Sequence, residues 1–194
     1  LLARRILNQG HGGIVALVDD LQVQQALRTL DVKYAQMQTY NYLRSLGERL
    51  EVAQMFRANS YTHTDKSAWR VRDYEISEAL ANIEEAIGAY ASLAMVDGAL
   101  VLRTNLGLVG FGARILAARP SAAYRALNVN GSEVEKIELS RLGTRNNAAG
   151  AFAMQCPGSL VYVCSEDGVA SVFMRRMNQL ILWRPADLDV FFQP

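Results

Sequence analysis

Apolar residues recur at helical spacing over residues 77–95, the longest regular pattern in the chain. These apolar positions are Ala79, Leu80, Ile83, Ala86, Ile87, Tyr90, Leu93 and Ala94. Residues three and four positions apart share one face of a helix, so these side chains would form a single apolar stripe. The pattern predicts a helix over Ser77–Met95.

The start of the chain predicts a helix, a tight turn and a buried strand in quick succession. Leu1–Asn8 carries apolar residues at helical spacing, and three glycines between Gln9 and Gly13 end it. Ile14–Val18 is a continuous β-rich apolar run, typical of a strand buried on both faces. Farther on, Val32–Asn59 is polar with helical spacing and is expected to be helical, whereas residues 59–73 suggest a loop or short elements.

Short β-rich runs separated by turn residues dominate the second half of the chain. The expected strands are Ala99–Leu102, Leu106–Phe111, Val134–Leu139, Ser159–Cys164, Val169–Met174 and a last edge strand at Ile181–Trp183. Asp167-Gly168 favours a hairpin turn between two of them. The alanine-rich segment Arg145–Met154 is expected to be a short helix with Thr144 as its cap. Residues 120–132 are expected to form an irregular connection.

This irregular alternation of strands and helices predicts an α/β fold with a mixed central β-sheet flanked by helices. The length of 194 residues fits a single domain over 1–194. Because the sequence begins at Leu1 rather than at Met, we expect it to be a piece of a longer protein.

Composition narrows the classes of protein that fit. Hydrophobic residues make up 51% of the chain, enough to bury a core and to exclude global disorder. The formal net charge of +1 lacks the basic excess of a non-specific nucleic-acid binder. Two cysteines, Cys156 and Cys164, are too few for a disulfide scaffold and are expected to pack as small apolar groups. No apolar run reaches roughly 18–20 residues and no signal peptide is visible, so we expect a cytoplasmic location and no membrane segment here.

Three common enzyme signatures do not occur in the sequence. They are the Gly-x-Ser-x-Gly elbow of serine hydrolases, the phosphate-binding loop of NTPases and the Gly-x-Gly-x-x-Gly turn of dinucleotide-binding oxidoreductases. Gly110-Phe111-Gly112 is too short to count as the last of these. The sequence therefore argues against these three classes.

A carboxylate and a glycine stand where the long predicted helix gives way to a strand, at Asp97-Gly98-Ala99. One interpretation is a metal-binding acid beside a strand whose glycine lets a ligand approach the backbone. The other is an ordinary Asp-Gly turn between a helix and a strand. The tripeptide alone does not decide between the two.

A second candidate is a Gly-Thr turn that runs into a predicted helix, at Leu142–Ala149. Backbone N–H groups at a helix start bind anions, and Thr144 and Arg145 would add a hydroxyl and a bidentate phosphate donor. The alternative is a capped helix with a surface arginine. Both interpretations stay open.

The third candidate, Ser165-Glu166-Asp167-Gly168, offers a hydroxyl and two carboxylates at a strand end. These groups could hold a metal or a ribose, or could form a solvated hairpin tip. His11, among glycines, and His63 are weaker candidates, because two distant histidines make a poor metal site.

Taken in this order, the three segments resemble the diadenylate cyclase domain. That family carries an Asp-Gly-Ala motif, a Gly-Thr-Arg-His-Arg-Ala-Ala-like string and a Ser-Glu-Glu-like strand end, similar to residues 97–99, 143–149 and 165–168 here. Gly110–Ile115 is similar to the family's glycine-rich strand, and Gln9–Ile14 resembles a branch described as nucleotide-binding sensor domains. The match covers Leu1–Val18 and Glu75–Phe173, with residues 19–74 as a family-variable helical region.

The resemblance implies a mixed α/β fold and a bacterial signalling reaction. Two facing domains, each holding one ATP with a divalent metal (Mg²⁺ or Mn²⁺), would release two pyrophosphates and form cyclic di-AMP. Asp97 would hold the metal and help activate the ribose hydroxyl, with Arg145 as the second catalytic residue. Gly98 and Ile115 would line the adenine pocket, and Ser165 and Glu166 would lie near the triphosphate and the metal. The residues implied to bind phosphates are Gly143, Thr144, Arg145 and Asn146. Ala99 and Asn147 are also implied to bind the nucleotide.

Two residues depart from the family motif, since Asn146 and Asn147 stand where the family has His and Arg. Phosphoryl transfer depends on neutralising charge in the transition state, and losing one preorganised donor costs about 2–4 kcal/mol, or roughly 10²–10³ in rate. Amides still donate hydrogen bonds, so binding should survive this change better than catalysis.

Three hypotheses follow. The chain is a nucleotide-binding sensor for ATP or an adenine dinucleotide, with little activity of its own and control over attached domains. Alternatively, it is a working diadenylate cyclase that tolerates the two asparagines. Alternatively, it is an unrelated structural or interaction domain in which the motifs are accidental. A homodimer or higher homo-oligomer fits the first two.

Overall fold

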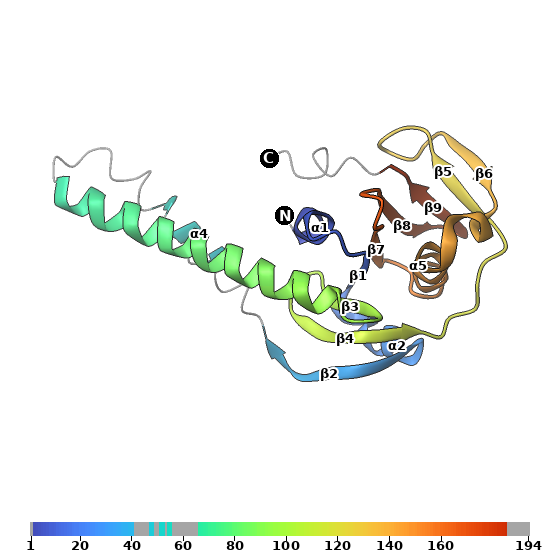
Figure 1. The fold of residues 1–194 in the computed structure, drawn as a ribbon, viewed down its shortest axis with the longest axis horizontal. Coiled ribbons are helices and arrows are strands. Elements are labelled where there is room, and N and C mark those ends of the chain that lie inside the picture. Colours follow the sequence, from blue (N-terminus) through green and yellow to red (C-terminus); the bar gives the residue numbers. More distant parts are fainter. Residues whose placement is uncertain (1, 41–46, 49–50, 53, 56–65, 186–194) are drawn as a thin grey trace.

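The computed structural model describes residues 2–40, 47–48, 51–52, 54–55 and 66–185 (Figure 1). Its helical elements are α1 (Leu2–Asn8), the 3-10 turn η1 (Asp20–Gln22), α2 (Val23–Arg28), α4 (Lys66–Ala94), the 3-10 turn η3 (Leu139–Leu142) and α5 (Gly143–Gln155). Its strands are β1 (Gly13–Val18), β2 (Leu30–Tyr40), β3 (Ala99–Arg103), β4 (Leu108–Ile115), β5 (Ala123–Ala126), β6 (Val134–Ile137), β7 (Leu160–Cys164), β8 (Ala170–Arg176) and β9 (Gln179–Trp183).

In the described part of the chain the strands form one mixed sheet in the order β2-β4-β3-β1-β7-β8-β9-β5-β6. β1 runs parallel to β3 and antiparallel to β7, and β5 runs parallel to β9. β3–β4 and β7–β8 are antiparallel neighbours in sequence and in space. The predicted fold class, a mixed α/β sheet flanked by helices, is therefore confirmed.

The side chains of alternate residues in the central strands pack into two hydrophobic cores, one on each face of the sheet. On one face, Ile14 and Val163 pack with Phe152 of α5 and Ala26 of α2. On the other face, alternate residues of the same strands pack against α1 and α4. The shift from one face to the other at successive residues explains why β1 is apolar throughout, as expected for a strand buried on both sides.

Helix α4 confirms the predicted helix over Ser77–Met95 and is longer than predicted, since it already begins at Lys66. Its C-terminal half packs on the sheet, where Ala86, Tyr90 and Ala91 are buried, and its N-terminal half extends away from the sheet (Figure 1). The expectation of a loop or short elements over residues 66–73 is wrong, because those residues continue the helix.

Three further expectations about secondary structure are corrected. Residues 32–40, expected to be helical, form most of β2, because they pair with β4. Part of the expected connection 120–132 is a strand, β5. Ile181–Trp183 is a strand as expected, but it is not an edge strand, because β9 lies between β8 and β5. The described residues between 47 and 55 are helical, and the rest of 41–65 lies outside the described residues.

The two cysteines behave as expected from their small size. Cys156 and Cys164 are both fully buried, and both are free thiols. Separately, none of the helices in the described ranges combines the length and the apolar character needed to cross a bilayer.

Candidate functional site

The candidate site lies at one end of the sheet, where the four strands β4, β3, β1 and β7 are neighbours (Figure 1). Ile14 of β1 is level with Ala99 of β3, and Gly13 is level with Cys164 of β7. Asp97 and Ser165 therefore leave the sheet at the level of Gly12. Neighbouring strands lie about 4.8 Å apart, so about 10 Å separates the outer two positions of this three-strand row.

Ile115 extends this row by one strand. Ala113 of β4 is level with Ala99, so Ile115 ends β4 at the level of Asp97. Its side chain is partly buried and packs against the core on the α5 face. The structure thus brings Ile115 and Asp97 to the same end of the sheet, on neighbouring strands.

The position of Gly98 requires a glycine, because the backbone of the neighbouring strand β4 lies too close to it for a side chain. Its φ is +118°, and a Cβ atom there would lie 2.6 Å from the carbonyl carbon of Gly112 and 2.7 Å from the backbone nitrogen of Ala113. Ala99, the next residue, is buried in β3. The glycine of the Asp-Gly-Ala segment therefore serves close packing of two strands, while the carboxylate of Asp97 is exposed to solvent.

Arg145 connects three segments that are far apart in the sequence. Its Nη1 donates to Oε1 of Glu166 at 2.9 Å. A Cβ atom on Gly12 would lie 2.4 Å from the same Nη1 and 3.0 Å from the carbonyl oxygen of Cys164. The side chains of Arg145 and Glu166 are 47% and 67% exposed, so both remain accessible from solvent. Gly12 was not among the predicted site residues, although the run of glycines around it was a signal.

The N-terminus of α5 has no side-chain cap. The helix begins at Gly143, whose φ of +82° favours glycine, and Leu142 is its N-cap. The expectation that Thr144 caps this helix is wrong, because Thr144 lies within the first turn, where it is exposed. The first backbone N–H groups of a helix have no partner within the helix, so this end can donate to an anion.

Asn146 and Asn147 point back into the protein. Nδ2 of Asn146 donates to the carbonyl oxygen of Leu142 at 2.8 Å, and Nδ2 of Asn147 donates to that of Gly143 at 2.7 Å. Only 4% and 7% of the two residues are exposed. Oδ1 of Asn146 is buried and has no hydrogen-bond partner among the described residues. Both side chains thus bind backbone carbonyls one turn earlier in the chain.

The loop Ser165–Gly168 forms the hairpin turn that the sequence predicted. The backbone nitrogen of Ser165 donates to the carbonyl oxygen of Val169 at 3.0 Å, and Gly168 has a φ of +80°. Oδ1 of Asp167 accepts from the backbone nitrogen of Val169 at 3.3 Å. Asp167 therefore supports the turn, which leaves Glu166 paired with Arg145 and Ser165 half-buried at the end of β7.

The remaining candidates add little to the site. His11 is exposed beside Gly12, and His63 lies outside the described residues. Burial raises the pKa of the Cys164 thiol to about 11, and burial also raises the pKa of Cys156, against an opposing hydrogen bond with Thr29. Neither thiol is suited to act as a nucleophile at neutral pH, because the thiolate is the reactive form. Within the described residues, no three His, Cys, Asp or Glu side chains form a group that could hold a metal on its own.

Comparison with known proteins finds similarity in the fold. No family model and no curated protein matches the sequence. The fold is similar to a crystal structure of DacA from Staphylococcus aureus, a double mutant with two introduced cysteines, with a TM-score of 0.47 and 11% sequence identity. The similarity covers 98% of this chain and 85% of that chain. DacA is a diadenylate cyclase, the family that the motifs of this chain resemble.

Proposed function

We propose that this domain is a nucleotide-binding sensor that takes ATP or an adenine dinucleotide with a divalent cation and controls domains attached to it. The observation that carries the proposal is the convergence of Asp97, Arg145 and Glu166, from three distant segments, at one end of the sheet. Chance matches to three short motifs have no reason to meet in space. That convergence counts against an accidental origin of the motifs.

Phosphate groups fit the start of α5. Its first N–H groups have no side-chain cap, and the guanidinium of Arg145 stands half-exposed beside them. A helix N-terminus and an arginine fork are complementary to a phosphate, because both present N–H donors and positive charge. Thr144, exposed in the same turn, adds a hydroxyl.

The negative charge of the carboxylates at this end of the sheet favours binding of a cation together with the nucleotide. Asp97, Glu166 and Asp167 are exposed carboxylates, and Arg145 pairs with Glu166. Mg²⁺ usually takes one or two carboxylates and completes its shell with phosphates and water. Asp97 fits this role, because its carboxylate is exposed and accepts no hydrogen bond from the described residues. A bound cation would neutralise part of the phosphate charge.

Asn146 and Asn147 favour binding over catalysis. One N–H of each amide is already used by a backbone carbonyl, and both side chains are buried. Neither supplies positive charge to a leaving pyrophosphate, so that charge would fall to Arg145 and the cation alone. Ground-state binding of phosphates needs fewer of these donors than the transition state does.

The test is a calorimetric titration of the protein with ATP in the presence of Mg²⁺ or Mn²⁺. Arg145→Ala should weaken binding about tenfold or more, because a charge-assisted hydrogen bond contributes about 1.5–3 kcal/mol. Arg114→Ala is the matched control, since Arg114 is also an exposed arginine paired with a carboxylate, Asp31, at 2.8 Å. Equal losses in both variants, or no binding to the unaltered protein, would refute the proposal.

A working diadenylate cyclase is the second candidate, favoured by the presence of both Asp97 and Arg145 at the site. That reaction needs two sites face to face, so its rate should rise more than linearly with protein concentration until a dimer is saturated. Mass spectrometry of the ATP reaction distinguishes the two functions. Rapid formation of cyclic di-AMP would promote the enzyme over the sensor.

A further inference from the structure

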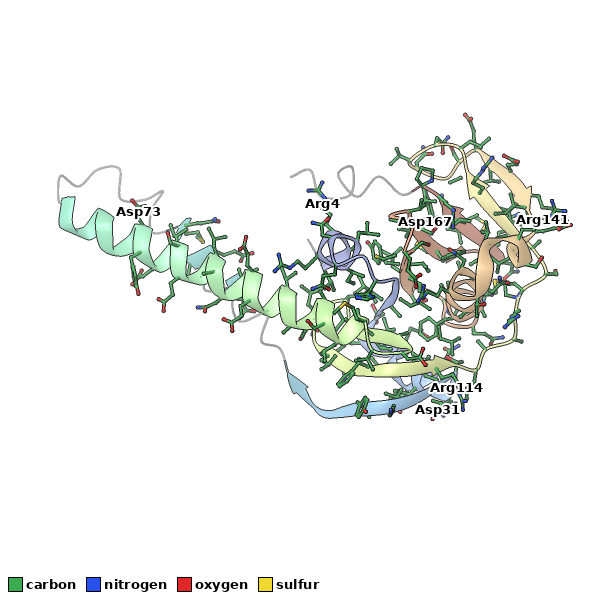
Figure 2. All side chains as sticks on the ribbon, in the orientation of Figure 1. Arg4, Asp31, Asp73, Arg114, Arg141 and Asp167 are labelled. Carbon is green, nitrogen blue, oxygen red and sulfur yellow. The ribbon has the colours of Figure 1, made fainter. Side chains whose placement is uncertain are left out.

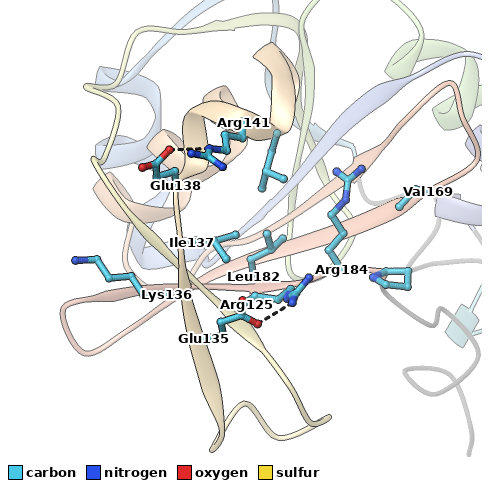
Figure 3. Close-up of a pocket in the computed structure, with 11 residues that line it drawn as sticks. Arg125, Glu135, Lys136, Ile137, Glu138, Arg141, Val169, Leu182 and Arg184 are labelled. Carbon is cyan, nitrogen blue, oxygen red and sulfur yellow. Dashed lines mark hydrogen bonds and ion pairs between the residues drawn. The ribbon is translucent and has the colours of Figure 1, made fainter.

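A pocket lies on the α5 face of the sheet, next to the start of α5 and the β7–β8 turn. It has a volume of about 670 Å³ and opens between the β5–β6 hairpin, the end of β9 and η3 (Figure 3). This volume lies in the usual range for small-molecule sites, about 300–1,000 Å³. Its lining contains four basic side chains, two acidic side chains and an apolar floor that includes Leu182 and Ile137.

Strand pairing explains why these side chains share one face. Arg125 of β5 is level with Glu135 of β6 and with Leu182 of β9, and residues level with one another across a sheet point to the same side. Arg184 lies two residues beyond Leu182 and keeps that side, since its Nη1 lies 3.4 Å from Oγ of Ser171 on β8. Leu182 packs in the α5-side core, so the pocket opens on that face.

Three arginines surround the pocket with donors to spare. Arg125 uses Nη2 on Glu135 at 2.7 Å, and Arg141 uses Nε on Glu138 at 2.8 Å. Arg184 has no carboxylate within ion-pair distance among the described residues. A guanidinium carries N–H donors on all three nitrogens, so each arginine keeps donors that the described protein groups do not use.

We propose that this pocket binds a small organic oxyanion, a carboxylate or a phosphate ester on an apolar body. The positive excess of the lining, with Arg184 free of any described carboxylate, supplies the recognition of the anionic group. Ile137, Leu142 and Val169, which are partly exposed, supply the apolar surface for the body of the ligand. An inorganic anion alone would leave most of the pocket volume unfilled.

The pocket is separate from the nucleotide site proposed above. Its arginines come from β5, η3 and the end of β9, and none of them belongs to the motifs around Asp97 and Arg145. Leu142 and Val169 line the pocket on the side facing the start of α5 and the β7–β8 turn. This inference does not depend on the proposed nucleotide-binding function, because no residue of that site is needed for the oxyanion.

The proposal is tested by NMR titration of the folded protein with phenyl phosphate and with phenylacetate, and with benzyl alcohol as the neutral probe. The two anions should bind with a Kd on the order of 1 mM or below, and the neutral probe should bind much more weakly. Arg184→Gln and Arg125→Gln should each weaken anion binding about tenfold or more. Glu135→Gln should strengthen it severalfold, because it removes the carboxylate that competes for Arg125.

Two control variants separate this site from general charge attraction and from the nucleotide site. Arg114→Gln removes an exposed arginine, which lies with Asp31 on the strands at the opposite end of the sheet order from β5 and β6 (Figure 2). Arg145→Ala removes the arginine of the nucleotide site, which stands four residues after Arg141. Arg114→Gln should keep the Kd within about twofold of the unaltered value, since charges beyond the Debye length of about 8–10 Å are largely screened. Arg145→Ala removes a nearer charge and should raise the Kd by less than Arg184→Gln does. No anion binding, or a loss in either control as large as in Arg184→Gln, would overturn the proposal.

Discussion

A methyl group on Gly12 would stand 2.4 Å from Nη1 of Arg145, so the glycine turn before β1 and the first turn of α5 are fitted to each other. The absence of a side chain at Gly12 gives the guanidinium the space in which it reaches Glu166. The position of the arginine therefore depends on a residue that is far away along the chain and carries no functional group of its own.

Gly12→Ala should weaken ATP binding while leaving the fold intact. The added Cβ would force the guanidinium of Arg145 away from its 2.9 Å contact with Glu166, and it would also lie 3.0 Å from the carbonyl oxygen of Cys164. We expect a loss of about 1–2 kcal/mol in unfolding free energy from overpacking and a clear rise in the Kd for ATP. Calorimetry and urea unfolding measure the two effects. An unchanged Kd would mean that Arg145 binds the nucleotide from another position, or not at all.

Gly150→Ala should destabilise the fold through overpacking alone. Its Cβ would lie 2.8 Å from Cδ2 of Leu139 and 2.9 Å from Cδ2 of Leu180, and both leucines are fully buried. Inserting a methyl group into such a core costs about 1–3 kcal/mol. Gly88→Ala is the matched control, because nothing lies within 4 Å of its added Cβ, and it should stabilise α4 by about 0.5–1 kcal/mol. The thermal unfolding temperature should fall for Gly150→Ala and rise for Gly88→Ala. A shift in the same direction for both variants would contradict this packing.

The double variant Asn146→His, Asn147→Arg, which restores the family residues, should lower stability. Both asparagines are buried and bind the carbonyl oxygens of Leu142 and Gly143, so larger side chains have to leave or deform the first turn of α5. We expect a loss of about 2–4 kcal/mol in unfolding free energy. Circular dichroism against temperature measures this loss.

The same variant also reports on catalysis. If it folds and then makes cyclic di-AMP from ATP, only the two side chains separate this chain from an active cyclase. In that background, Asp97→Asn should abolish turnover, because the cation would lose its carboxylate. If it folds, binds ATP and stays inactive, the site differs from a cyclase in more than these two residues.

Stability should fall above about pH 9 because of the buried thiol of Cys164. Burial raises its pKa from 9.0 to about 11 in the folded protein. Between these two values the unfolded chain has lost the proton and the folded chain has kept it, so the unfolding free energy decreases as pH rises. The decrease amounts to about 2–3 kcal/mol over that interval. Urea unfolding at pH 8 and pH 10 should show a smaller difference for Cys164→Ala than for the unaltered protein. Equal differences would place the titrating group elsewhere.

The central strands could be predicted because their own residues determine them. β1 is buried on both faces and is apolar throughout, and the β7–β8 hairpin has an Asp-Gly turn between two apolar runs. β2 could not be predicted in this way, because it is an edge strand and its Lys33, Tyr34 and Ala35 are exposed. Its strand conformation comes from pairing with β4, which lies far along the chain, and that pairing leaves no local pattern.

The candidate site could be predicted only as far as the order of the three motifs along the chain corresponds to their positions in space. The sequence indicated Asp97, Arg145 and Glu166. The register of β1 with β3 and β7 brings Asp97 and the loop that carries Glu166 to one sheet end, and the ion pair with Glu166 brings Arg145 of α5 there. It could not show that Asn146 and Asn147 bind backbone carbonyls, since an amide N–H can donate to a phosphate oxygen or to a carbonyl oxygen. The basic pocket could not be predicted from the sequence for another reason. Its arginines are far apart along the chain and come together only through the pairing of β9, β5 and β6.

Because β9 lies between β8 and β5, the sheet cannot be completed until the last part of the described chain is in place. β5 and β6 pair with each other, but they reach the other described strands only through β9, which is made long after β5. During synthesis the edge of β5 that pairs with β9 therefore stays unpaired until β9 has left the ribosome. Closure of such long chain loops slows folding and leaves strand edges open to wrong partners. Pulsed hydrogen exchange during refolding should show β5 and β6 protected later than β1 and β7.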